Sequence, residues 1–402
     1  MSFWTLLLAL AVHPVDDTMV VKNQKTPSGK AQTLVFEEDL RFGADEASDD
    51  YLWAATSVTL TVDDAGHIFV GDPKTNDIRE FDAEGKFLRK IASEGPGPGE
   101  LQALNRIQFL ADGRLAVFEQ KPMFPARIQY YDKDGKFLKL AQPQGMGTIP
   151  LTAVFNPTGT MYVGPVMHID VQGGALVTKT GISKTENFSL EKEYSSFSRK
   201  VDFSRMGDPA VMADMIGDII DGFFAGAGVF AFDKDGNLYA AMSGSYEITK
   251  WDPTLSKKLL VISREYKPIA LTDEEKRAVA DSVADNFRQT PMASMVTDEF
   301  IDRMMGRINF PTVKDPIEGM GVTEDGHLLV VHDFNVSAGK QTVDIFSPEG
   351  KYLGQTTREN WAFMDPDRNW RMVFKKGYAY TIETDDADDN RLVRYRYRIA
   401  AP

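Results

Sequence analysis

The sequence predicts an all-β fold, a six-bladed β-propeller built from four-stranded blades. Three observations support this prediction: six glycine turns with similar flanks, spacings close to the length of one blade, and an N-terminal strand-like run without another partner. Self-similarity at a fixed period is the sequence signature of repeat folds, and a period of about 40 to 50 residues with four strands is typical of propeller blades.

Each repeat is centred on a glycine in a short polar turn, such as DDAGH or DKDGN. Turns of this composition connect the strands of hairpins, because glycine adopts a positive φ at no steric cost. In all six copies, the residue four positions before the glycine and the residue two positions after it are apolar. The six turn glycines are Gly66, Gly113, Gly159, Gly236, Gly326 and Gly377.

The intervals between these glycines are 47, 46, 77, 90 and 51 residues. The two long intervals contain the good helical patterns of the chain, which predicts helical insertions at about 203–225 and 271–315, between blades 3 and 4 and between blades 4 and 5. Asp208 followed by Pro209 is a helix start in the first insertion, and Thr272 with Glu275 is a capping box in the second.

The end of the chain predicts how the ring closes. After Gly377 only two strands remain, at 379–384 and 391–399, so the sixth blade lacks its outer strand. The run Thr33–Phe42 has the pattern of a strand, and we expect it to complete the last blade and remove the free edges of the ring. The propeller is therefore predicted to span residues 33–402.

One repeat carries a resemblance to a known family. The string from Val62 to Glu100 contains a turn glycine, an apolar strand ending in Asp, a polar loop with Asn, an aromatic-Asp-x-x-Gly turn and a Gly-Pro-rich link. It resembles an NHL repeat, well in blades 1, 2 and 5, partly in blades 4 and 6, and poorly in blade 3. The resemblance implies a six-bladed propeller but no single function, because similar propellers serve as lyases, lactonases, protein-binding platforms and receptors.

Composition restricts the possible partners. The net charge of −14 disfavours nucleic acid and anionic membranes, and the absence of cysteine excludes disulfides, thiolate metal sites and a lipid-modified cysteine. Residues 1–32 are assigned to a signal-peptide-like segment and a linker, because the apolar run Phe3–Val12 is too short to span a bilayer and contains Ala9 and Ala11 in a small-x-small pattern. This predicts a periplasmic or secreted protein; a buried or wrongly assigned N-terminus is the alternative.

The repeat also predicts which residues share the mouth of the central channel. The position six residues after each turn glycine lies at the mouth-side end of the second strand, and its identity varies from blade to blade. The starts of the inner strands reach the same mouth. The predicted ligand-binding residues are Asp72, Arg106, Glu119, Glu318, His332 and Glu383.

These residues leave two main hypotheses open. The first is a non-catalytic, exported, monomeric propeller that binds a peptide, glycan or protein partner at the mouth and a helical cap, without a cofactor. The second is a metal-assisted hydrolase, such as a lactonase or esterase, in which Asp72, Glu119 and Glu383 hold Ca²⁺ and His332 moves protons. An intracellular scaffold is a third. The chain lacks a G-x-S-x-G motif, and its mouth loops contain only two histidines, His168 and His332, too few for a three-histidine zinc site.

The helical insertions are rich in methionine, with seven of the 17 methionines of the chain: Met206, Met212, Met215, Met292, Met295, Met304 and Met305. Methionine suits surfaces that repack around varied partners. The alternative is that the helices bury their apolar stripes on the propeller and the methionines fill gaps.

Overall fold

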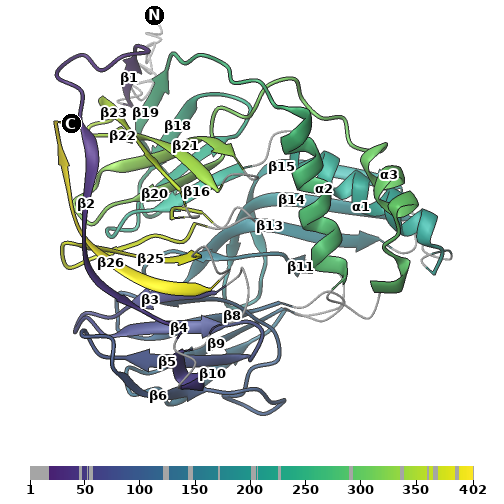
Figure 1. Cartoon of the computed structure of the whole chain (residues 1–402), viewed down its shortest axis with the longest axis horizontal. Helices are drawn as coiled ribbons and strands as arrows, with labels where there is room; N and C mark the ends of the chain where they lie inside the picture. Colours follow the sequence, from purple (N-terminus) through teal and green to yellow (C-terminus); the bar gives the residue numbers. More distant parts are fainter. Residues whose placement is uncertain are drawn as a thin grey trace, which may run out of the picture.

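The computed structural model describes residues 18–401 except 45–47, 52, 54–57, 121–125, 144–147, 171–172, 201–204, 206, 225–227, 289–292, 336–338, 360–361, 365–369 and 385–388. In this part of the chain, six β-sheets follow one another around a ring, and the sixth contacts the first (Figure 1). The predicted six-bladed β-propeller is confirmed.

Each of the first two blades is a meander of four antiparallel strands. The strands of blade 1 are β3 (Thr59–Val62), β4 (Ile68–Asp72), β5 (Asp77–Phe81) and β6 (Phe87–Ala92). The strands of blade 2 are β7 (Leu104–Phe109), β8 (Leu115–Glu119), β9 (Arg127–Tyr131) and β10 (Phe137–Ala141). A short 3-10 helix, η1 (Asp49–Tyr51), precedes blade 1.

The remaining blades repeat this order with additions. The strands of blade 3 are β11 (Thr148–Pro150), β12 (Val154–Phe155), β13 (Met161–Asp170), β14 (Ala175–Lys184) and β15 (Leu190–Lys200). Those of blade 4 are β16 (Gly228–Phe232), β17 (Leu238–Met242), β18 (Glu247–Trp251) and β19 (Lys258–Arg264). Those of blade 5 are β20 (Gly319–Val322), β21 (Leu328–Asn335), β22 (Lys340–Phe346) and β23 (Tyr352–Arg358). Blade 6 contains β24 (Val373–Lys375), β25 (Tyr378–Thr384) and β26 (Asn390–Ala400).

The glycine turns form as their sequence indicates. Gly66 has a φ of +98°, and the carboxylate of Asp63 accepts the backbone N–H groups of Gly66 at 2.7 Å and His67 at 2.8 Å. An Asp that bonds the backbone of its own turn, followed by a residue with positive φ, is a stable hairpin connection. The strand after the turn, β4, is buried at all five positions, as its two apolar faces predict.

The N-terminal segment closes the ring, and it does more than the sequence predicts. The predicted strand, β2 (Thr33–Phe42), pairs antiparallel with β26 from Thr33 opposite Ala400 to Phe42 opposite Leu392, which confirms the predicted closure. Residues 19–23, assigned to a linker in the sequence analysis, instead form β1 (Met19–Asn23), which pairs in parallel with β19 of blade 4. We call residues 18–42 the N-terminal strap.

From the end of β1 to the start of β2, the N-terminal strap crosses the outer edge of blade 5. The side chain of Asn23 donates to the Gly350 carbonyl at 2.9 Å and accepts the Tyr352 N–H at 2.8 Å. The Gln32 N–H donates to the Leu353 carbonyl at 2.9 Å. The strap therefore binds the outer edges of three successive blades.

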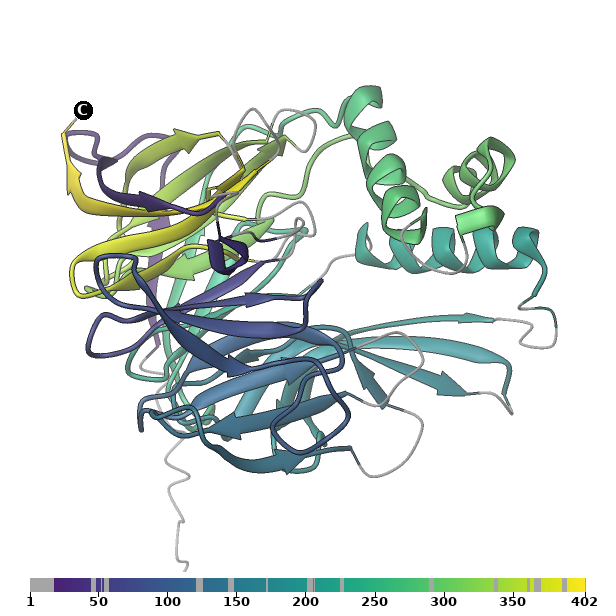
Figure 2. The same cartoon turned by 60° about the horizontal axis from the view of Figure 1, so that its bottom comes forward.

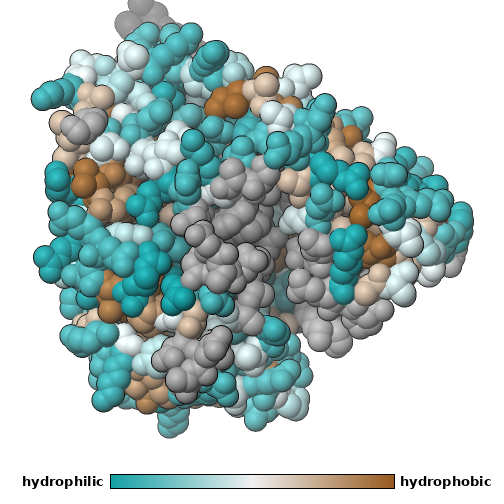
Figure 3. Space-filling model, in the orientation of Figure 1, coloured by the Kyte–Doolittle hydropathy of each residue, from teal (hydrophilic) through white to brown (hydrophobic). Residues whose placement is uncertain are grey.

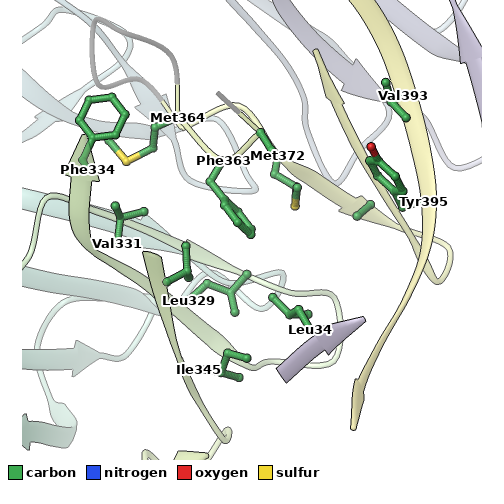
Figure 4. Packing of buried hydrophobic residues seen from close by; sticks show 13 residues of the cluster. Leu34, Leu329, Val331, Phe334, Ile345, Phe363, Met364, Met372, Val393 and Tyr395 are labelled. Atoms are coloured by element: carbon green, nitrogen blue, oxygen red, sulfur yellow. The ribbon is translucent and has the colours of Figure 1, made fainter. Parts of the chain in front are cut away.

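The strap also contributes to the core between blades 5 and 6. Leu34 is 4% exposed and packs in one cluster with Leu329, Val331 and Ile345 of blade 5 and with Val393 of blade 6 (Figure 4). Burial of one leucine removes enough apolar surface from water to stabilise the fold by roughly 1.5 to 3 kcal/mol. The closing strand is thus held by side-chain packing as well as by its backbone ladder.

The predicted insertions form three α-helices: α1 (Pro209–Phe224), α2 (Asp273–Arg288) and α3 (Asp298–Met305). A short 3-10 helix, η3 (Ala293–Met295), precedes α3. The predicted capping box is present, since the Glu275 N–H donates to the Thr272 hydroxyl at 3.2 Å and the Thr272 N–H donates to the Glu275 carboxylate at 3.1 Å. We call α1, α2 and α3 together the helical module.

The apolar stripes of these helices pack against one another and form a core separate from the propeller. Its buried members are Met212, Ala213, Ile216, Ile220, Ala280, Ala284, Phe300, Ile301, Met304 and Ile308. Met215, Met295 and Met305 pack against this core, whereas Met206 and Met292 lie outside the described residues. The expectation that the stripes are buried on the propeller is therefore wrong, although the methionines do fill a core.

The extra residues of the first long interval are only partly helical. Part of them lengthens blade 3, where β13 and β14 have ten residues each and β15 has eleven. Figure 2 shows these long strands extending beyond the other blades on the side of the molecule that carries the helical module. Sequence periodicity identified the added length but not its division between a hairpin and a helix.

The N-terminal strap gives the first prediction. Leu34→Ala removes a side chain that is 4% exposed, and we expect the free energy of unfolding to fall by about 2 to 5 kcal/mol. The matched control is Leu88→Ala on the outermost strand of blade 1, where the leucine is 44% exposed and the loss should stay within about 0.5 kcal/mol. Urea unfolding measures both, and equal losses would contradict a closing role for the strap.

Candidate functional site

The residues predicted to share the mouth lie at the expected ends of their strands. Asp72 and Glu119 are the last residues of β4 and β8, and His332 and Glu383 lie in the last halves of β21 and β25. Arg106 is in β7, and Glu318 directly precedes β20. The links between blades leave from this same end, which we call the mouth side.

The carboxylate of Glu119 is 2% exposed and is bonded within its own blade. It accepts the Arg127 guanidinium at 2.7 Å, the Gln129 side-chain amide at 2.7 Å and the Gln102 backbone N–H at 2.7 Å. A buried charge is tolerated when it is paired and its lone pairs are satisfied, and this carboxylate meets both conditions. Glu119 therefore joins the link before blade 2 to the blade itself.

Glu383 has a similar role at the closure of the ring. Its carboxylate accepts the Tyr395 hydroxyl at 2.7 Å, Arg358 of blade 5 at 3.0 Å and Arg41 of the N-terminal strap at 3.2 Å. Burial, reinforced by the nearby Glu383 charge, raises the pKa of Tyr395 to about 12, so the hydroxyl keeps its proton and donates it to this bond. Glu383 connects blade 5, blade 6 and the strap.

Asp72 and Glu318 are also buried, at 1% and 8% exposure. Asp72 accepts the Lys74 N–H at 2.9 Å, and Glu318 accepts the Phe334 N–H at 2.7 Å, so both carboxylates order the backbone of their own blades. Arg106 is half-buried in the inner strand β7. These positions agree with the predicted ends of the strands, and Glu119, His332 and Glu383 belong to three different polar networks.

The predicted convergence of Asp72, Glu119 and Glu383 on one Ca²⁺ ion is therefore wrong. In the part of the chain that the structure describes, no three Asp, Glu or His side chains lie close enough together to hold a metal ion. Calcium takes six to eight oxygen ligands, whereas Glu119 and Glu383 already bond guanidinium groups. Periodicity predicted the end of each strand correctly but not the cation beside each acid.

His332 belongs to a buried polar network between blades 4 and 5, which we call the interblade network. Its centre is Asp344 of β22, which is fully buried and accepts the Tyr246 hydroxyl and the Arg264 guanidinium. The Nε2 atom of His332 lies 3.4 Å from the free oxygen of this carboxylate, and Arg264 also donates to the Tyr352 hydroxyl at 3.0 Å. Tyr246 and Arg264 come from blade 4, and the other three residues come from blade 5.

The electrostatics of the interblade network reflect its burial. Burial raises the pKa of Asp344 even though Arg264 and His332 oppose this shift, and burial together with the Asp344 charge raises the pKa of Tyr246 well above its ordinary value. The guanidinium of Arg264 also lies 4.0 Å from the ring centroid of Tyr352. The arrangement keeps one buried carboxylate between a cation and a phenol that donates its proton.

Sequence reasoning missed most of this network. Of its members, only His332 occupies the varied position of the repeat; Tyr246 follows the turn MSGS, and Arg264 ends an outer strand. One usable signal exists, because Asp344 is a single charge in the buried strand TVDIF. A buried charge requires a partner, so this aspartate predicts a cation nearby without indicating which one.

The helical module is attached to blade 3 on one side. Arg199 of β15 donates to the Asp221 carboxylate of α1 at 2.6 Å, and Asn309 bonds the other oxygen of that carboxylate at 2.8 Å through its backbone N–H. Gly222 of α1 lies so close to Phe197 that an added Cβ atom would be 2.6 Å from the ring. Within the module, Arg307 forms a two-bond pair with Asp218 of α1.

The other attachment is to blade 5. The ammonium of Lys314, itself 7% exposed, lies 2.5 Å from Glu275 of α2 and 2.7 Å from Asp333 of β21. Burial favours a higher pKa for Glu275, but the bonds from Lys314 and Thr272 outweigh it and lower the pKa. The module thus bridges blades 3 and 5 on the mouth side, and Asp333 places one attachment directly beside His332.

The surface over this region is mixed in character. On the face shown in Figure 3, apolar residues form small, separate patches between hydrophilic ones, and one such patch lies on the helical module at the right of the view. Among the helices that the structure describes, none has both the length and the apolar character needed to cross a membrane. Mixed surfaces of this kind are ordinary for protein and ligand interfaces.

Comparison with known proteins identifies the fold. A family model, DUF5128, described as a 6-bladed beta-propeller, matches residues 16–142. A solved member of the DUF4221 family from Bacteroides vulgatus is 11% identical, with a TM-score of 0.53 over 93% of this chain and 99% of that chain. A protein from Bacteroides fragilis, named as a candidate exported protein, is 10% identical, with a TM-score of 0.47 over 94% of this chain and 100% of that chain. No curated protein matches the chain.

The interblade network gives the second prediction. Arg264→Gln leaves the fully buried Asp344 without its cation, and we expect a loss of about 3 to 5 kcal/mol in the free energy of unfolding. Adding Asp344→Asn should recover part of this loss, because the uncompensated charge is then removed. Urea unfolding of the two single variants and the double variant measures the coupling.

The matched control is Lys179→Gln, which breaks an exposed ion pair with Glu193 whose side chains are 41% and 40% exposed. Exposed pairs contribute about 0 to 1 kcal/mol. If Arg264→Gln costs no more than this control, the interblade network does not hold blades 4 and 5 together.

Proposed function

We propose that this chain is an exported, non-catalytic propeller that binds a peptide, glycan or protein partner at its mouth and against the helical module. The observation that carries the proposal is the attachment of one helical module to blades 3 and 5, beside His332 and Glu318. Two insertions at successive blade boundaries build a separate helical body on the mouth side. An added body with its own core is a means of shaping a binding surface on a repeated scaffold.

The state of the mouth carboxylates supports binding over catalysis. A general acid or base needs a titrating group within reach of substrate, whereas Glu119 and Glu383 are buried and bonded to arginine. The hydrolase hypothesis also required three oxygen ligands on one ion, and the described residues do not provide that set. We expect a partner to contact the half-buried Arg106 and the part of the His332 ring that is not turned toward Asp344.

The third prediction tests binding at the mouth. Peptide and glycan arrays are probed with the labelled, purified protein, and each hit is titrated by calorimetry against variants. We expect His332→Ala and Arg106→Ala to weaken binding about tenfold, which corresponds to roughly 1.4 kcal/mol. The matched control is His67→Ala, in a glycine turn at the opposite end of blade 1, which should leave the affinity within about twofold.

Several outcomes contradict this proposal. Arrays without a saturable hit would contradict it, and so would equal effects of His332→Ala and His67→Ala. The thermal midpoint should also be the same with EDTA and with added Ca²⁺, because the described acids do not form a metal site. A shift of several degrees, or ester hydrolysis that depends on Ca²⁺, would favour the hydrolase instead.

Export gives the fourth prediction. The apolar run Phe3–Val12 ends near Ala9 and Ala11, and cleavage there would leave both strands of the N-terminal strap in the mature protein. We expect the intact mass of the protein from the periplasm or the medium to correspond to a chain that begins close to residue 12. Recovery of the protein from the cytosol with Met1 retained would overturn the export proposal and leave the binding proposal to its own test.

A further inference from the structure

The outer edges of the blades are unequally covered. The N-terminal strap pairs with the outer strands of blades 4 and 6 and bonds that of blade 5. The outer strands β6 of blade 1, β10 of blade 2 and β15 of blade 3 each pair with a strand on one side only, and β15 also bonds the helical module through Arg199. An uncovered outer strand presents a row of backbone N–H and C=O groups that another strand can bond. The strap shows that blades of this molecule accept an added strand in either direction, since β1 is parallel and β2 is antiparallel.

Exposed apolar side chains gather on these outermost strands. Of the six large apolar residues that are strongly exposed in the described part of the chain, five lie on an outermost strand: Met19, Val20, Leu88, Leu138 and Leu140. Two of them, Leu138 at 46% and Leu140 at 40% exposure, are on β10. Blade 2 therefore combines a free backbone edge with two leucines in contact with water.

Charge distinguishes β10 from the equivalent strand of blade 1. On β6, Arg89 lies 2.6 Å from Glu80 and Lys90 lies 3.0 Å from Asp77, so the basic groups are neutralised within the blade. On blade 2, Lys133, Lys136 and Lys139 have no carboxylate partner among the described residues, and Lys139 instead lies 4.6 Å from the ring centroid of Tyr130. The turn before β10 also carries Asp132 and Asp134, so residues 132–141 hold three lysines against two aspartates, a net charge of +1 in a chain whose net charge is −14.

The positive charge beside β10 indicates which kind of strand could pair with this edge. Pairing of β10 with β10 of a second copy would bring like charges together, and lysine on an edge strand is a known protection against such self-pairing. The same lysines attract a strand that carries carboxylates. We propose that β10 is a docking edge for an extended segment of another protein in which apolar residues alternate with Asp or Glu.

In this complex the backbone of β10 provides the hydrogen bonds, Leu138 and Leu140 contact the apolar side chains, and Lys136 and Lys139 select the acidic ones. The docking edge is separate from the mouth and the helical module, so it does not rest on the function proposed above. A partner strand here would extend blade 2 in the way that β1 extends blade 4.

The experiment uses fluorescent peptides of about ten residues, the length of a long strand. One alternates Val and Glu, one alternates Val and Lys, and one is the Val-Glu peptide with a central proline that prevents strand pairing. Fluorescence polarisation with the full chain should show saturable binding of the Val-Glu peptide that is at least about tenfold tighter than that of the other two. Hydrogen exchange should slow at residues 137–141 when this peptide binds.

Two double variants and one control locate the binding. Leu138→Ser with Leu140→Ser should weaken binding of the Val-Glu peptide about tenfold, and Lys136→Glu with Lys139→Glu should reverse the preference toward the Val-Lys peptide. The matched control, Leu88→Ser on β6, should leave the affinity unchanged. Circular dichroism and thermal midpoints verify that the variants remain folded.

The opposite results overturn the proposal. The proposal is wrong if the Val-Glu peptide does not bind or if the three peptides bind equally well. It is also wrong if peptide binding slows hydrogen exchange at amides away from β10. If light scattering instead shows a dimer of the wild-type chain that the leucine variants dissociate, the edge belongs to a second copy and the acidic partner is excluded.

Discussion

The addition of strands to exposed blade edges is the interaction on which this structure depends. A ring of sheets has no covalent closure here, because the chain contains no cysteine. The N-terminal strap closes the ring without a covalent bond. It bonds the outer edges of blades 4, 5 and 6, and its Leu34 packs in the core between blades 5 and 6. Opening the ring would expose this core and three backbone edges together, so closure is cooperative across half of the ring.

Buried ion pairs are a second constraint on the structure, because they give the buried acids a structural role. Asp344, Glu119 and Glu383 each join an arginine within a blade or across a blade boundary. Removing one partner from such a pair costs about 3 to 5 kcal/mol, against about 0 to 1 kcal/mol for an exposed pair. These three acids therefore hold strands and blades in place.

Sequence periodicity was sufficient to predict the ring of blades, but it did not predict the extra strand β1 or the arginines that bond the buried acids. The glycine turns were predictable because their pattern is repeated. The strand Thr33–Phe42 was predictable because blade 6 lacked an outer strand. The strand β1 was not, because blade 4 already has four strands and nothing in the repeat requires a fifth. Similarly, the end of a strand predicts where Glu383 lies, whereas its bonds to Arg41 and Arg358 join residues 342 and 25 positions away and have no local signal.

The insertions and the strap together make the ring asymmetric. Both insertions flank blade 4 in the sequence and emerge on the mouth side, which allows their apolar stripes to meet in one core and to attach to blades 3 and 5. Blade 4 is consequently enclosed by the module attachments on either side and by β1 at its outer edge, whereas blades 1 and 2 keep bare outer strands. The outer strand of blade 3, β15, also pairs with a strand on one side only, but its Arg199 bonds Asp221 of the helical module. The way in which the chain closes the ring thus leaves its outer edges unequal: the strap and the helical module contact blades 3 to 6, and β6 and β10 remain without such a contact among the described residues.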